Sequence, residues 1–265
     1  MLLLPRALQE LLLPNRLIKK SESDQYAYYE KVVKNGIKNT KWEKDIEQFL
    51  KTGQGFGLSY SGKSILDISG GPGFRGKQLT ELGAHVCVTE FNAEASAAMA
   101  RALDLDVRKF DYANDFIHEV FMDKVFDLVI VRFSIGYCDN LSEFIDSLKK
   151  RLNPKAQVMI SFPEPSVPYF IRHQLQEYNY STLHSCQAIK SAFQEKGFTI
   201  QAEKNNKREL FEDYPRRPNQ PSYKRLLLSW TRDYLGKKYL QKNFAGPNQV
   251  AKSTLENYDL ILQLN

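Results

Sequence analysis

The 265-residue sequence contains no apolar run that approaches the roughly 20 residues of a membrane-spanning helix. Its most apolar stretches, residues 1–5 and 11–14, are separated by Arg6, Gln9 and Glu10. They do not form the continuous apolar region of a secretory signal peptide, so we expect a cytoplasmic protein with no membrane partner.

Cysteine is also scarce. Cys87, Cys138 and Cys186 are odd in number and far apart in the sequence. This fits free thiols better than a disulfide framework or a metal-binding cysteine cluster. We therefore predict no metal site. The chain is long enough for one α/β domain with attached helices, and its 42% hydrophobic and 26% charged residues are typical of a globular protein.

The charge is mildly basic, with a formal net charge of +6 and a pI near 9.0. Much of the excess lies in residues 204–225 and 237–242. Such a skew can indicate nucleic-acid binding, but a solvated surface is the commoner cause. We therefore do not expect a nucleic-acid partner, and no sequence feature indicates an oligomeric state.

The chain is organised around residues 64–74. A short run of β-branched residues and leucine surrounds Asp67 and is followed by Gly70, Gly71 and Gly73. This pattern predicts a buried parallel strand that stops at a tight turn. Residues 75–83 then have helical character, and doubly wound sheets bind nucleotide-like ligands at such a strand–turn–helix junction.

Two cofactors compete for this turn. Residues 71–76 satisfy the dinucleotide pattern G-x-G-x-x-G, and Glu90 ends the next strand at the spacing of a ribose-binding acid. Asp67 argues against a dinucleotide, because its carboxylate would lie close to the like charge of a pyrophosphate. A ligand that carries an ammonium and a sulfonium would be attracted instead. That description fits S-adenosylmethionine, and the dehydrogenase interpretation stays open as the weaker alternative.

On these residues the chain resembles the class I S-adenosylmethionine-dependent methyltransferases of the small-molecule type. Their first motif, acid-x-Gly-x-Gly-x-Gly, stands here as residues 67–73, with Ser69 in place of the first glycine. The resemblance covers about residues 60–232. It implies an α/β fold: a seven-stranded, mostly parallel Rossmann-like sheet with one antiparallel strand, helices on both faces and an N-terminal helical lid.

The implied domain plan has an N-terminal cap or lid at 1–57, a cofactor-binding domain at 58–234 and a C-terminal extension at 235–265. An aromatic insertion at 163–183 is expected to shape the acceptor pocket. Helices are predicted at residues 24–33, 41–50, 93–103, 140–152 and 184–196. Strands are predicted at 84–90, 105–110, 126–131 and 157–162, with an antiparallel closing pair at 198–202 and 223–232. A turn is predicted at 153–156, a long basic loop at 204–221, and weak helical patterning in the tail.

The resemblance also implies roles for individual residues. Glu90 would bind the ribose hydroxyls, although a strand-end glutamate can equally cap a helix. Asp111 would bind the adenine amino group and Tyr112 would flank the ring, although Asp111 could be an N-cap. The full expected cofactor set is Asp67, Ser69, Gly70, Gly71, Gly73, Glu90, Phe91, Asp111, Tyr112, Arg132 and Phe133.

A general base is needed only when the methyl acceptor must lose a proton. Glu164, His173 and His184 all follow the acceptor edge in the sequence. His173 and His184 are the preferred candidates, because histidine titrates near neutral pH. His184 could instead cap its own helix. His85 and His118 are expected to face away from the ligand edge and to be structural.

These residues favour a methyltransferase that acts on an oxygen or nitrogen of a small, aromatic-compatible molecule. A second hypothesis is an RNA or protein methyltransferase that uses the basic region 204–242 to contact its substrate. The third is a protein that keeps the cofactor fold without transferring a methyl group.

Overall fold

The computed structural model describes residues 41–165, 184–209 and 254–265. Most of them belong to one compact unit, made of Lys20–Phe162, Ser181–Lys204 and Tyr258–Asn265. The second unit, Met1–Lys19 with Pro163–Tyr180 and Asn205–Asn257, is described only at strand ends. The predicted helix at 24–33, most of the insertion, and the predicted strand at 223–232 therefore lie outside the described residues.

The described chain forms a seven-stranded sheet in the order β3-β2-β1-β4-β5-β7-β6. Strands β1 to β5 are parallel where they pair. The seven strands are β1 (Ser64–Ile68), β2 (His85–Glu90), β3 (Asp106–Lys109), β4 (Phe126–Arg132), β5 (Leu152–Pro165), β6 (Phe198–Glu209) and β7 (Thr254–Leu264). This arrangement confirms the predicted α/β class and the mostly parallel, Rossmann-like sheet.

Strand β7 runs antiparallel to both of its neighbours. Against β6, the Asn265 amide donates to the Gly197 carbonyl and the Thr199 hydroxyl donates to the Gln263 carbonyl. Against β5, Ser161 bonds to Asp259 and Gln263 bonds to Lys155. On both sides the residue number rises in one strand as it falls in the other, which is the pattern of an antiparallel ladder.

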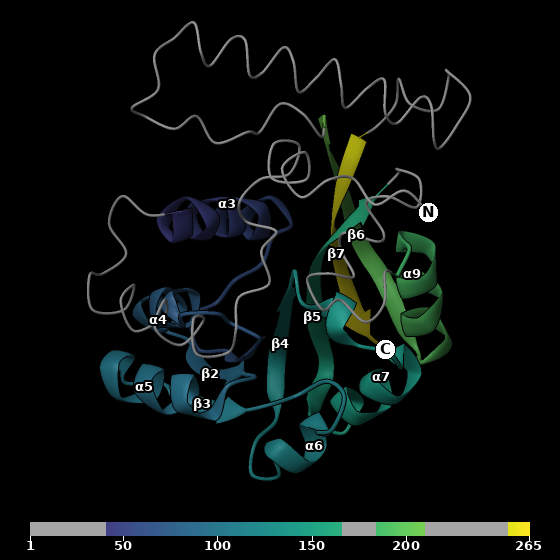
Figure 1. The fold of residues 1–265 in the computed structure, drawn as a ribbon. Coiled ribbons are helices and arrows are strands. Elements are labelled where there is room, and N and C mark those ends of the chain that lie inside the picture. Colours follow the sequence, from purple (N-terminus) through teal and green to yellow (C-terminus); the bar gives the residue numbers. More distant parts are fainter. Residues whose placement is uncertain (1–40, 166–183, 210–253) are drawn as a thin grey trace, which may run out of the picture. The chain divides into compact units, whose positions relative to one another are not determined.

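Helices cover both faces of the sheet (Figure 1). On one face lie α3 (Lys41–Gly55), α4 (Phe74–Glu81) and α5 (Ala93–Leu103). The other face carries α6 (Ile117–Val120), α7 (Leu141–Lys149) and α9 (Cys186–Glu195).

Each face has its own hydrophobic core. In β1, Ile65 packs into the core under α3 and α4, whereas Leu66 and Ile68 pack into the core under α6, α7 and α9. This alternation follows from the two-residue period of a strand. It also turns Asp67, two residues after Ile65, toward the α3 and α4 face.

Most predicted elements are confirmed within a few residues, and α5 begins and ends at the predicted positions. Three predictions are wrong. Thr254–Leu264 is a strand inside the sheet rather than a helically patterned tail, and it is the neighbour of β6 that the prediction placed at 223–232. Helix α7 ends at Lys149, whereas the prediction continued it to Leu152. Residues 204–209, predicted to begin a long loop, continue β6.

The turn predicted at residues 153–156 is instead an irregularity inside β5. Its pairing with β4 passes from Leu152 to Gln157 while β4 advances only from Phe126 to Leu128. Lys155 has a positive φ of 63° at this point.

No helix in the described part of the chain is long and apolar enough to cross a membrane.

Candidate functional site

The predicted cofactor residues lie at the ends of β1, β2, β3 and β4 or just after them. These carboxyl ends meet at one edge because the strands are parallel. Strands β1 and β4 are neighbours, and the chain order reverses between them. Such a reversal is where doubly wound sheets bind ligands. Both strands are followed by a residue with an unusual left-handed backbone: Ser69 has φ 54° and Phe133 has φ 56°.

The turn after β1 is fixed to β2 through one buried threonine. The Ser69 amide donates to the Thr89 hydroxyl at 2.9 Å, and the Gly70 amide donates to the Thr89 carbonyl at 3.1 Å. Gly71 and Gly73 follow with φ of 62° and 78°. Ser69 therefore adopts the left-handed conformation that the family's usual glycine would supply. Thr89 had no recognisable signal in the sequence.

Gly70 is required because there is no space for a side chain at this position. A Cβ at this position would lie 2.6 Å from Cγ1 of Val88 and 2.8 Å from Oδ2 of Asp67. At Gly73 a Cβ would lie 2.9 Å from Cδ1 of Leu103. The glycines thus let the turn sit tightly against β2 and α5, where a side chain would collide with its neighbours.

Asp67 is fully buried and is paired with Arg75 of α4. The Arg75 Nη2 lies 2.6 Å from Oδ1, and its Nε lies 3.1 and 3.0 Å from the two carboxylate oxygens. Burial raises the pKa of Asp67, while the Arg75 guanidinium opposes the rise. The charge of Asp67 is therefore compensated within the protein, which weakens the sequence argument that this acid alone would repel a pyrophosphate.

Glu90 lies at the end of β2 with only 4% of its surface exposed. Its carboxylate accepts hydrogen bonds from the backbone of Phe91, at 3.0 Å, and of Asn92. Burial raises the pKa of Glu90 to about 7. A buried carboxylate with a raised pKa at a ligand edge is a strong candidate for a functional group. Beside it, the Phe91 ring is 45% exposed.

Asp111 and Tyr112, at the end of β3, differ in their surroundings. The Asp111 carboxylate accepts hydrogen bonds from the Ala113 amide and the Asn114 side chain, so it closes its own turn. Tyr112 packs against Phe110 and Phe144. Its hydroxyl bonds to Ser134 at 3.0 Å, and burial raises its pKa.

The end of β4 brings a buried cation to the site. Arg132 is 8% exposed and donates to Asp45 of α3, at 2.7 and 3.3 Å, and to Ser161. Its guanidinium also lies 4.8 Å from the centre of the Phe133 ring. The Phe133 amide donates to the Ser161 carbonyl at 2.7 Å, which holds the left-handed residue against β5.

The two candidate bases differ in what the structure describes. His184 is half-buried, and its Nε2 lies 2.6 Å from the Cys138 carbonyl, a contact in which the ring nitrogen donates. His173 lies outside the described residues. Within residues 41–165, 184–209 and 254–265, no group of His, Cys, Asp or Glu is arranged to hold a metal ion.

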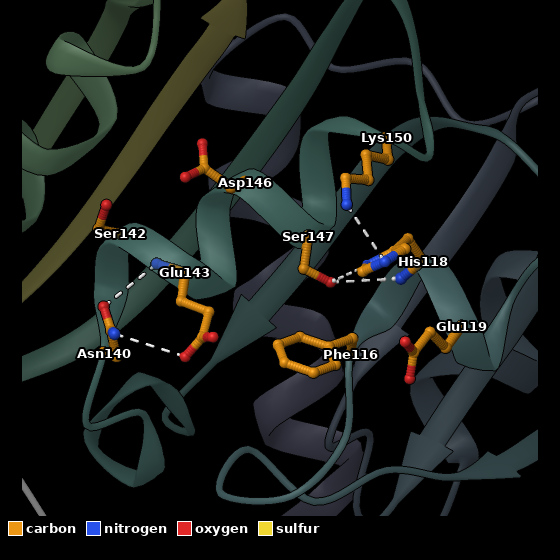
Figure 2. A pocket seen from close by; sticks show the side chains of 9 residues that line it. All are labelled: Phe116, His118, Glu119, Asn140, Ser142, Glu143, Asp146, Ser147 and Lys150. Atoms are coloured by element: carbon orange, nitrogen blue, oxygen red, sulfur yellow. Dashed lines mark hydrogen bonds between the residues drawn. The ribbon is translucent and has the colours of Figure 1, made fainter.

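A polar groove of about 500 Å³ lies away from these residues, along α6 and α7 (Figure 2). In it His118, predicted to be structural, bonds through Nδ1 to Ser147 and through Nε2 to Lys150, at 3.0 and 3.2 Å. None of the predicted cofactor residues lines this groove. A ligand site is usually largely apolar, so the edge with Glu90 and the glycine turn remains the better candidate.

The structure thus brings the predicted residues of β1, β2, β3 and β4 to one edge. It adds residues whose importance the sequence did not signal: Asp45, Arg75, Thr89, Ser134, Ser161 and Asp259. Each of them forms a hydrogen bond with a residue that lies 8 to 98 positions away in the sequence. Sequence patterns that span one strand and one turn cannot show such pairs.

Comparison with known proteins gives a consistent result. A family model described as a methyltransferase domain matches residues 37–203. Among curated proteins, the ubiquinone biosynthesis O-methyltransferase of Rickettsia bellii is 33% identical over 98 residues. That match covers 37% of this chain and 40% of the relative, so it spans less than half of either protein.

Solved structures share the fold at low sequence identity. The N-methyltransferase NodS of Bradyrhizobium japonicum, in complex with S-adenosyl-L-homocysteine, is 11% identical with a TM-score of 0.51; 91% of this chain and 98% of NodS are covered. A Haemonchus contortus phosphoethanolamine N-methyltransferase 2 complex is 16% identical with a TM-score of 0.51, over 83% of this chain and 52% of that one. At these identities the likeness shows the fold.

Proposed function

The chain belongs to the methyltransferase-domain family, and from that premise we propose that it transfers a methyl group from S-adenosylmethionine to an oxygen or nitrogen of a small molecule. The observation that carries this proposal is the edge formed by β1, β2 and β4. There a crowded glycine turn and a buried carboxylate follow adjacent strands at the point where the strand order reverses.

The residues present fit the cofactor. Glu90 has two carboxylate oxygens that can accept the two ribose hydroxyls. The exposed ring of Phe91 offers an apolar face to the adenine, and Asp111 follows the next strand. The turn from Ser69 to Gly73 would approach the methionine end through its backbone, because its three glycines carry no side chain.

When bound, S-adenosylmethionine supplies a methyl carbon already activated by the positively charged sulfur. The protein then mainly needs to hold donor and acceptor close and in line, which can supply most of the acceleration. Exposed rings of Phe133 and Tyr137, at 37% and 40%, stand after β4 and could contact an acceptor. If the acceptor is a hydroxyl, His184 or His173 would take its proton.

Support for a small-molecule acceptor comes from the names of similar proteins, an O-methyltransferase of ubiquinone biosynthesis and N-methyltransferases. Cys87, Cys138 and Cys186 are buried and form no disulfide bond, which fits a reducing compartment, and we propose that the protein acts in the cytoplasm. The basic region 204–242, central to the RNA or protein hypothesis, lies almost wholly outside the described residues.

The test uses the full chain with S-adenosylmethionine that carries an isotopic label on the methyl group. Panels of phenols, amines, total RNA and total protein serve as acceptors, and label transfer and S-adenosylhomocysteine are both measured. We expect label in a phenol or amine, with transfer lost in Glu90→Ala. Label in RNA or protein alone would contradict the small-molecule proposal. If the chain neither transfers label nor binds the cofactor, the proposal that it is a methyltransferase enzyme is contradicted.

A further inference from the structure

We propose that Asp45 of α3 is a positioning residue for the cofactor site, because it holds two arginines from different sides of that site in one buried network. Arg75 lies beside the glycine turn and Arg132 ends β4. The inference rests on the proposed function, since it assigns Asp45 a role in the affinity of the same site. In this role Asp45 acts through the arginines and does not contact the cofactor.

The contacts of Asp45 are directional. Arg132 donates to both of its oxygens, from Nη2 at 2.7 Å and from Nε at 3.3 Å, in the two-point geometry that arginine forms with a carboxylate. Arg75 Nη1 lies 3.9 Å from Oδ2 of the same carboxylate. One side chain of α3 therefore contacts elements on both sides of the β1–β4 boundary.

Phe49 strengthens this contact from the same face of the helix, because residues four apart in a helix are neighbours. Its ring is fully buried. The guanidinium carbons of Arg75 and Arg132 lie 5.6 and 5.9 Å from its centre. At these distances a cation is attracted to the aromatic face. Asp45 and Phe49 thus fix both arginines against α3.

The network continues across the sheet. Arg132 also donates to the Ser161 hydroxyl at 3.3 Å, and Ser161 donates to Asp259 of β7 at 2.6 Å. The side chains of Arg75 and Arg132 are only 7% and 6% exposed. A buried guanidinium that loses its carboxylate must find another partner or move toward water.

Removal of the Asp45 charge affects the two arginines unequally. Arg75 would keep the two-point contact with Asp67, whereas Arg132 would keep the neutral hydroxyl of Ser161. Arg132 directly precedes Phe133, whose left-handed backbone borders the site. A shift of Arg132 would therefore disturb the end of β4, and the loss would appear as weaker cofactor binding.

The experiment compares Asp45→Asn with Glu47→Gln in the full chain. Glu47 is an exposed acid on the same helix, so its replacement controls for a change of charge on α3. Binding of S-adenosylhomocysteine is measured by calorimetry at a temperature well below the unfolding midpoint of every variant. We expect the Kd to rise about tenfold or more in Asp45→Asn, as for residues coupled in one network, and less than twofold in Glu47→Gln.

Conservative variants separate positioning from folding. Asp45→Glu keeps the carboxylate and should recover part of the affinity. Arg132→Lys keeps the charge without the two-point contact and should weaken binding; both variants decide the question if Asp45→Asn does not fold. In the double variant Asp45→Asn with Arg132→Gln, the Kd should exceed that of the weaker-binding single variant by less than twofold.

Two failures can be told apart. If the wild-type chain binds S-adenosylhomocysteine and every Asp45 and Arg132 variant stays within twofold of it, the role of Asp45 is wrong and the proposed function stands. Multiplicative losses in the double variant would also overturn the inference, because independent sites add in free energy. If the wild-type chain itself does not bind, the proposed function fails and the inference falls with it.

Discussion

Glu90 is a residue whose burial opposes stability and whose position favours binding. Burial raises its pKa from 4.5 to about 7, so a substantial fraction of the ligand-free protein carries a neutral carboxyl at neutral pH. Ribose hydroxyls prefer the ionised form, which accepts through both oxygens. Affinity for the cofactor should therefore depend on pH in a range where ordinary glutamates are fully ionised.

We predict that the Kd for S-adenosylhomocysteine rises as the pH falls below about 7, approaching tenfold per pH unit because only the ionised fraction is competent to bind. Calorimetric titration of the protein with S-adenosylhomocysteine measures this dependence. The pH is varied from about 5.5 to about 8.5, on both sides of the shifted pKa. Glu90→Gln should bind more weakly at pH 8 and show a flat profile. A wild-type profile as flat as that of the variant would contradict the role of Glu90.

Glu90→Gln should also stabilise the ligand-free protein at high pH. Because the folded pKa is raised, the stability linked to this group is fully present below pH 4.5 and is lost as the pH rises to about 7. Glutamine removes that loss, so the free energy of unfolding should increase by up to roughly 3 kcal/mol at pH 8 and hardly change at pH 4.5. Urea denaturation at the two pH values measures the difference, and equal effects at both would refute the assignment.

The glycine turn allows a third prediction at the level of single residues. In Gly70→Ala the new methyl group would overlap Val88 and the Asp67 carboxylate. We expect a loss of about 1–3 kcal/mol in stability, as for other overpacked sites, together with weaker cofactor binding. Gly55→Ala is the control, because no atom lies within 4 Å of its added Cβ. If both variants unfold at the same urea concentration as the wild type, the turn is less tightly packed than described.

Among the elements, those defined by local patterns were predicted well and those defined by distant partners were not. Helix α5 and strands β1, β2 and β4 follow from short apolar patterns and glycine turns. Strand β7 joins β5 and β6 only through long-range pairing. Its apolar run is too short for periodicity to separate a strand from a helix, and tertiary pairing decided its conformation.

The position of β7 inside the sheet makes it important for stability. Leu260 is fully buried in the core beneath α7 and α9. We predict that Leu260→Ala lowers the free energy of unfolding by about 2–5 kcal/mol, the range for leucine replaced by alanine in a core. Leu82→Ala, at a site 43% exposed, should change it by less than about 0.5 kcal/mol. Equal urea midpoints for the two variants would show that β7 contributes little.

Across the whole molecule, the site is assembled from both local and distant parts. The acids and glycines at the ends of β1 and β2 could be recognised in the sequence because each follows its own strand. The pairing of Asp67 with Arg75, and of Asp45 with Arg132, could not, since it depends on how α4 and α3 pack on the sheet. Arginine compensates Asp67, so the preference for a cationic donor depends more on Glu90 and the shape of the turn than on Asp67 alone.

The central claim is that the carboxyl edge of β1, β2 and β4 binds S-adenosylmethionine rather than a dinucleotide. Calorimetric titration of the full chain with S-adenosylmethionine and with NAD⁺, at pH 8 where Glu90 is ionised, tests it most directly. We predict one-to-one binding of S-adenosylmethionine with a Kd below about 100 µM and no measurable heat with NAD⁺. Saturable binding of NAD⁺ without binding of S-adenosylmethionine would contradict the claim.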